Sequence, residues 1–291
     1  YGYNKNSIIG EVFDRKFKVL TDENLKKINF SLLNTGVDID VNLDELKKDF
    51  PLKGTVKAKL LNSNIKFDFN YDDEKLKIKN SYFRNKELSF NNETIITHFP
   101  FFNINTNFDI EDINTKLLKN LNLNKILDSK NIIKKINSKN KIHYKIKKFR
   151  RHLIDELKIN IDLAHGRLVY SKNLSISKNL FNCQGDTNLL DEFPILYFNC
   201  SIISKNKKEL LKKFLIKYET ENELFSLNFK GNFNLLNNKI NFNSITIDKD
   251  FEASKEDLKY FKEKFEKIVF NENFINIFSL DKIKNFILEV T

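Results

Sequence analysis

Short runs in which apolar and polar residues alternate occur along most of the chain. In TVKAKLLNSNIKFDFNY (residues 55–71), Val56 and Ala58 share one parity, and Ile65, Phe67 and Phe69 share one parity after a turn. Residues 102–110 and 157–163 show the same alternation. A period of two is typical of strands that have one apolar and one solvated face. The sequence therefore predicts a mainly β (α+β) fold built from an elongated antiparallel sheet.

Four predicted turns resemble one another, each with two Leu, an Asn or Asp, a short loop and an Ile- or Phe-bearing strand. They lie at residues 32–39, 60–67, 189–198 and 235–242. In addition, NCQGDTNLLD (182–191) matches NFKGNFNLLN (228–237) at Asn, Gly, Asn, Leu and Leu. Asn and Asp close tight turns, and a strand Gly suits a bulge or bend. We interpret the pattern as a repeated β-hairpin; chance identity in an Asn- and Leu-rich chain is the alternative.

Helical spacing is strongest at the C-terminal end. Residues 252–270 place Leu258, Phe261 and Phe265 on one face, with Ser254 as the expected N-cap and Asp257 three positions later. Residues 280–290 form a second amphipathic segment. We expect these helices to cover an end of the sheet, and lying on a membrane surface is the alternative.

A basic segment divides the predicted β regions. Residues 113–152 are rich in Lys and Arg, and Asp128 is their only acidic residue. Ile142, Ile146, Phe149 and Leu153 fit a helical face. The expected organisation is a β part at 1–112, a basic, partly helical insert at 113–152, β-hairpin repeats at 153–250 and capping helices at 251–291. The insert is either a solvated connector or a patch that faces anionic lipid.

The net charge is +11, but Arg occurs only at positions 15, 84, 150, 151 and 167. Proteins that read nucleic acids favour Arg for its bidentate geometry. A positive charge carried mainly by Lys therefore indicates a solvated surface, or attraction to an anionic membrane surface. Nucleic acid is not the expected partner. A basic protein that binds nucleic acid through residues 113–152 remains the alternative function.

No catalytic motif stands out in the sequence. The four His (His98, His143, His152 and His165) are scattered without metal-ligand spacing, and Gly-rich phosphate loops and nucleophile elbows are absent. We expect a non-enzymatic protein without cofactor or metal.

The two cysteines have an informative spacing. If Asp191 and Glu192 form a two-residue loop, Cys183 faces Cys200 across the hairpin. A disulfide would then form in an oxidising compartment. Because the second copy of the repeat carries Phe229 and Ser244 at these places, ordinary apolar-face cysteines are the alternative.

Most of the chain resembles the AsmA-like proteins of the Gram-negative envelope. The resemblance rests on HGRLVYSKNLSISKNLFNCQGDTNLLDEFPILYFNCSI, on its echo LNFKGNFNLLNNKINFNSITID and on the closing helices, and it extends to GEVFDRKFKVL and LKGTVKAKLLNSNIKFDF. It implies a periplasmic sheet curled into an apolar groove, an N-terminal helix that anchors the protein in the inner membrane, and a role in lipid transport or outer-membrane assembly. Because the sequence starts at Tyr1 and has no Met, we expect that anchor to precede it.

The expected ligand is a phospholipid or other acyl lipid, which would lie along the inward-facing residues. The candidate groove residues are Ile65, Phe67, Phe69, Ile104, Phe108, Ile159, Ile161, Phe198, Leu235, Ile240 and Phe242. The same side chains could instead meet one another in a closed sandwich, or the sheet could be a purely structural β-repeat scaffold.

Overall fold

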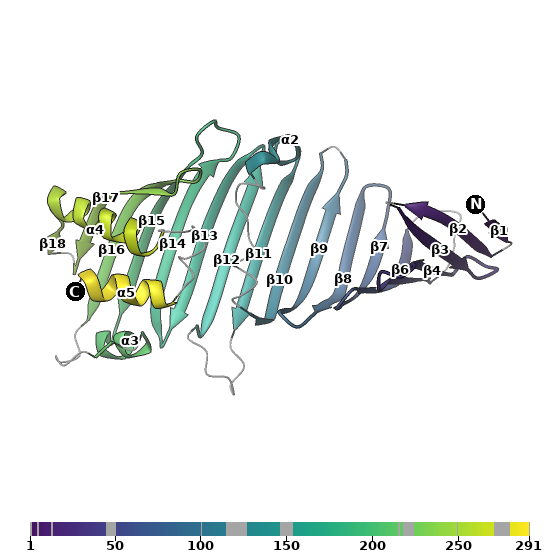
Figure 1. The fold of residues 1–291 in the computed structure, drawn as a ribbon, viewed down its shortest axis with the longest axis horizontal. Coiled ribbons are helices and arrows are strands. Elements are labelled where there is room, and N and C mark those ends of the chain that lie inside the picture. The colour runs from purple at the N-terminus through teal and green to yellow at the C-terminus, as the bar shows by residue number, and fades with distance from the viewer. Residues whose placement is uncertain are drawn as a thin grey trace. The chain divides into compact units, whose positions relative to one another are not determined.

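The computed structural model is mainly β, with helices concentrated toward the C-terminal end (Figure 1). It describes residues 2–4, 6–12, 14–44, 51–99, 101–114, 127–145, 154–214, 216–217, 224–248, 250–270 and 280–290. The chain divides into two compact units, unit 1 (Tyr1–Asn114) and unit 2 (Thr115–Thr291). The boundary lies two residues after the predicted one at 112.

Unit 1 is an antiparallel meander in which each strand pairs with the next along the chain. Its strands are β1 (Gly2–Asn4), β2 (Ser7–Val12), β3 (Arg15–Thr21), β4 (Lys27–Leu32), β5 (Val37–Leu43), β6 (Leu52–Leu60), β7 (Ser63–Tyr71), β8 (Lys75–Arg84), β9 (Leu88–Thr97) and β10 (Asn103–Ile113). A bulge at Lys79 and Asn80 shifts the register of β8 against both neighbours. The residues of β8 on the apolar face are therefore odd-numbered after the bulge and even-numbered before it.

Unit 2 repeats this architecture and adds helices. Its elements are α2 (Lys130–Ile133), β11 (Asn137–Lys145), β12 (Glu156–Ala164), β13 (Arg167–Ile176), β14 (Asn179–Asn188), β15 (Ile195–Ser204), α3 (Lys207–Lys213), β16 (Phe225–Asn234), β17 (Lys239–Ile247), β18 (Phe251–Glu252), α4 (Lys255–Ile268) and α5 (Leu280–Val290). The strands again pair antiparallel in chain order. The predicted antiparallel fold with C-terminal amphipathic helices is confirmed.

All four predicted turns connect adjacent strands of a hairpin, and the match between 182–191 and 228–237 has a structural cause. Asn188 and Asn234 occupy the same place, and the side-chain oxygen of each accepts a hydrogen bond from the backbone N–H two residues later (3.2 and 3.0 Å). Leu189 and Leu235, which follow them, are both buried in one core cluster. The repeated letters therefore specify an Asn-closed turn followed by a core Leu.

The matching glycines allow a close approach between strands. A Cβ on Gly185 would collide with the carbonyl oxygen of Tyr197, and one on Gly231 would collide with that of Asn241 and with the Phe198 ring. A register shift lies beside Gly231, where a bulge was predicted, whereas none lies at Gly185.

Helices α4 and α5 lie against the sheet of unit 2, as Figure 1 shows. The expected cap of α4 is present as a capping box between Ser254 and Asp257. The carboxylate of Glu266 accepts from the Ile240 N–H (3.0 Å), which fixes α4 to β17. Val269 and Phe270 enter a core that also contains Leu189, Phe233, Leu235 and Ile240.

Two features differ from the sequence-based expectations. Ile142 lies in β11 and not in a helix, because Ser138, Asn140, Ile142 and Tyr144 alternate with Lys139, Lys141 and His143. The remaining positions of that predicted helical face, 146, 149 and 153, lie outside the described residues. Helix α3 was not predicted; Asn206 caps it by accepting from the Glu209 N–H (2.8 Å), and Leu210 and Phe214 are buried.

Replacing Phe233 should reveal how much this core stabilises unit 2. Phe233 is 3% exposed, so Phe233→Ala should lower the free energy of unfolding by about 3–5 kcal/mol. The control is Phe251→Ala, because Phe251 is 52% exposed and its loss should cost far less. Urea denaturation followed by circular dichroism measures both values, and equal effects would contradict the assigned core.

Candidate functional site

The apolar side chains of unit 1 share one face of its sheet. Strand register places one residue per strand in a row that crosses β3 to β10 without a polar member. This row, which we call row 1, consists of Val19, Phe30, Ile39, Ala58, Ile65, Phe83, Phe90 and Ile110. At ~4.8 Å between strands, its seven steps extend over roughly 34 Å.

Side chains of row 1 also contact one another directly. The Phe83 and Phe90 rings stack with centroids 5.0 Å apart, and Phe108 meets Phe90 edge-on at 5.4 Å. Of the candidate groove residues, Ile65 belongs to row 1, and Phe67, Phe69, Ile104 and Phe108 lie on the same face. The register therefore brings together every candidate groove residue of unit 1.

Burial is what distinguishes unit 1 from a closed sandwich. Within its described residues no hydrophobic side chain is fully buried, and every member of row 1 is only half-buried. The inner residues of packed sheets normally lose almost all contact with water. The apolar face of unit 1 is thus a single-layer surface in the part of the chain that the structure describes.

A short polar row interrupts this face. Thr94 and Thr106 are buried, and their hydroxyl oxygens lie 3.2 Å apart. Asn92 donates to Thr94 (2.9 Å), and the Ser81 hydroxyl donates to Asn92. Because these groups bond one another, they place a satisfied polar strip beside row 1.

Unit 2 has an equivalent apolar face and an equivalent row. This row, which we call row 2, crosses β11 to β17 without a polar member. It consists of Tyr144, Leu157, Leu174, Phe181, Ile202, Leu227 and Ile247.

Helices fill part of the apolar face of unit 2. Leu235 and Ile240 are 7% and 5% exposed, so both candidate groove residues belong to the helix-covered core. Phe198 and Phe242 pack against the same core, and Phe242 meets Phe265 of α4 at 6.0 Å. Only Ile159 and Ile161, on β12, stay half-buried away from that cluster. A second core cluster, which includes Ile176 and Leu210 of α3, packs against Leu174, Phe181 and Ile283 of α5. The candidate surface of unit 2 therefore narrows to β11 and β12.

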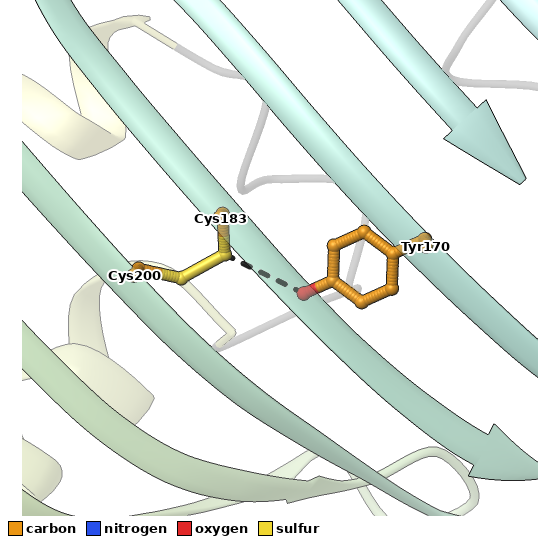
Figure 2. The surroundings of a disulfide bond; sticks show 3 residues. All are labelled: Tyr170, Cys183 and Cys200. Carbon is orange, nitrogen blue, oxygen red and sulfur yellow. Dashed lines mark hydrogen bonds between the residues drawn. A yellow bond between two sulfur atoms is a disulfide. The ribbon is translucent and has the colours of Figure 1, made fainter.

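The cysteines form a disulfide on the apolar face, confirming the predicted pairing (Figure 2). Cys183 and Cys200 are directly opposed in the register that the sequence predicted. The loop, however, is longer than two residues, because β14 ends at Asn188 and β15 begins at Ile195. Figure 2 shows the Tyr170 hydroxyl directed at the Cys183 Sγ, 3.5 Å away.

One lysine lies on the apolar face beside this disulfide. Lys172 faces Ile159 on one neighbouring strand and Cys183 on the other. Burial lowers its pKa, because the ammonium group loses hydration, and burial likewise raises the pKa of Tyr170. None of the described acidic residues pairs with Lys172.

The histidines occupy unrelated places. His98 lies in a loop near the Tyr71 and Phe102 rings, and His143 lies 3.0 Å from a Glu156 oxygen. His165 occupies a turn with positive φ, and position 152 lies outside the described residues. In the described ranges, no cluster of three or more His, Cys, Asp or Glu could hold a metal ion. Nor does any helix of those ranges have the length and apolarity needed to cross a membrane.

The opposite face of unit 2 is polar and carries a shallow hollow. It is lined by Asn160, Asp162, Arg167, Val169, Gln184 and Tyr197 among others. An Arg167–Asp186 ion pair at 3.2 Å lies at its side. This hollow offers hydrogen-bonding groups together with the exposed side chains of Val169 and Tyr197.

Comparison with known proteins does not assign the chain. No protein-family model matches it, and neither a curated protein nor a solved structure shows significant similarity to it.

Removing the disulfide should destabilise unit 2. The bridge joins residues 17 positions apart, and closing a loop of that size is worth about 3 kcal/mol in the chain-entropy model. The double variant Cys183→Ala/Cys200→Ala should lose about that much unfolding free energy in urea. A reductant should destabilise the wild type and leave the variant unchanged. A wild type that is insensitive to reductant would contradict the bridge.

Removing the charge of Lys172 should stabilise the ligand-free protein. Lys172→Met should raise the unfolding free energy by on the order of 1 kcal/mol at pH 7, because a poorly hydrated cation is lost. The pKa of Lys172 in the folded state lies below the ordinary 10.5. At pH values above that folded pKa, the folded state therefore binds fewer protons than the unfolded state. Wild-type stability should therefore rise relative to the variant as the pH increases up to about 10.4.

The control for this comparison is Lys141→Met, because Lys141 is exposed on the polar face of β11. Its effect should stay within about 0.5 kcal/mol. Thermal denaturation at pH 7 and pH 10 measures all three proteins. Destabilisation by Lys172→Met at pH 7 would show that the ammonium group is well solvated.

Proposed function

We propose that this protein is a non-enzymatic, AsmA-like envelope protein that carries acyl lipid along the apolar faces of its sheet. The observation that carries the proposal is the half-buried state of row 1, since no described side chain of unit 1 covers it fully. A protein in water that leaves such a continuous apolar surface partly exposed generally uses it for binding.

The energetics suit a hydrocarbon ligand. Each buried CH2 group contributes about 0.8 kcal/mol, so eight methylenes along row 1 would gain on the order of 6 kcal/mol before the entropic costs of binding. The headgroup would stay in water. Such a track needs no catalytic or metal-binding residue, and movement along it needs no fixed stopping point.

The disulfide supports an envelope location. Disulfides persist in oxidising compartments such as the bacterial periplasm and are rare in the cytosol. Together with the strand-repeat resemblance, it favours a periplasmic body, and the expected inner-membrane anchor belongs to the same proposal.

The test is lipid uptake by the delipidated chain. After incubation with vesicles of phosphatidylethanolamine and phosphatidylglycerol, the re-isolated protein should carry phospholipid that is detectable by native mass spectrometry. Ile65→Glu should reduce the bound lipid several-fold, because it places a charge in the middle of row 1.

A matched control exists on the same strand. Asn64→Glu makes the same charge change at the neighbouring residue of β7, which is exposed on the opposite face, and should leave uptake unchanged. Circular dichroism checks that both variants fold. A wild type that takes up no lipid would favour the structural scaffold, and steeply salt-dependent binding to DNA or RNA instead would favour the nucleic-acid alternative.

A further inference from the structure

Lys172 is the third of seven members of a cross-strand row that is otherwise without charge. The register orders this third row as Ile142, Ile159, Lys172, Cys183, Cys200, Phe229 and Ile245. Along its own strand, the residues on the same face are Tyr170 and Leu174. The ammonium group is therefore attached at a position surrounded by apolar groups, a disulfide and one phenol.

Among the described residues, this arrangement lacks the usual compensation for a desolvated charge. Poorly hydrated lysines are normally paired with a carboxylate, and none of the described acidic residues lies at salt-bridge distance from Lys172. Burial is the cause of its lowered pKa. An anion that arrives with a ligand would supply the missing partner.

We propose that Lys172 is the headgroup site of unit 2, where it pairs with the single anionic group of an acyl-chain ligand. The hydrocarbon would lie over Ile159 and Ile142, which are half-buried. The other direction along the row ends at Ile245, which is buried at 7% exposure. A fatty-acid carboxylate and a lipid phosphate share the required chemistry, an anion at one end of an alkyl chain.

This inference rests on the proposed function, and the probes are chosen to separate the two. Dodecanoate and dodecyl phosphate carry the anion, whereas dodecanol has the same alkyl chain without it. Isothermal titration of each probe into the delipidated 291-residue chain at pH 7 measures affinity for the wild type, Lys172→Met and Lys141→Met. Lys141→Met removes one positive charge from the exposed polar face and serves as the matched control.

The expected result is a charge preference that depends on Lys172 alone. The wild type and Lys141→Met should bind dodecanoate or dodecyl phosphate about tenfold more tightly than dodecanol. In Lys172→Met the preference should disappear while dodecanol binding is retained, which also shows that the variant is folded. The preferred anion identifies the headgroup class, fatty acid or phosphorylated lipid.

Two results would overturn the inference in distinguishable ways. In the first, all three probes bind, but either the wild type shows no preference for the anionic probes or Lys172→Met keeps that preference. Acyl binding then stands, and the headgroup role of Lys172 is wrong. If no probe binds the wild type, acyl binding by unit 2 falls, and the headgroup site falls with it.

Discussion

An antiparallel sheet whose strands alternate apolar and polar residues presents one continuous apolar face, and that face needs cover from a second layer. Unit 2 supplies cover from its own chain, because α4 brings Phe265 to the sheet and the residues that follow it, Val269 and Phe270, reach Phe233. The described part of unit 1 supplies none, and its apolar side chains stay half-buried. The candidate binding surface is thus the part of a face that the fold leaves unfilled.

Hairpin addition explains how the chain maintains this geometry over many strands. Each turn is closed locally, as by Asn188 and Asn234, so a new hairpin needs no contact with distant sequence to set its register. Because neighbouring strands stay in register, apolar residues align into rows across the sheet. Along a strand the face ends after about ten residues, whereas across the strands a row continues for as long as hairpins are added. A hydrocarbon track in such a sheet therefore runs across the strands.

Local sequence was sufficient for the strands, the Asn-closed turns, the Ser254 cap and the opposition of Cys183 and Cys200. These features depend on the period of the pattern, on capping chemistry and on the position of one predicted hairpin loop. The sequence could not predict which apolar residues a second layer would cover, since alternation assigns both Leu235 and Phe67 to an apolar face. Only the three-dimensional placement of α4 makes Leu235 core. The bulge at Lys79 and Asn80 and the position of Lys172 beside Cys183 likewise follow from pairing between strands, which one strand's pattern does not encode.

The third row shows how one charged residue changes the chemistry of an apolar surface. Row 1 is uncharged throughout, so a hydrocarbon chain along it would meet similar side chains at every step, and no position would be a preferred stop. Row 2 is uncharged as well, but Leu174, Phe181 and Ile202 pack against the core formed with α3 and α5. A charge placed among Ile159, Leu174 and Cys183 breaks that equivalence, because its interaction with an anion strengthens where water is scarce. The same scarcity of water makes the unpaired ammonium group costly, since it loses hydration and none of the described carboxylates pairs with it. In the proposed headgroup site, selectivity for an anion and lower stability of the ligand-free protein would therefore both arise from one desolvated charge.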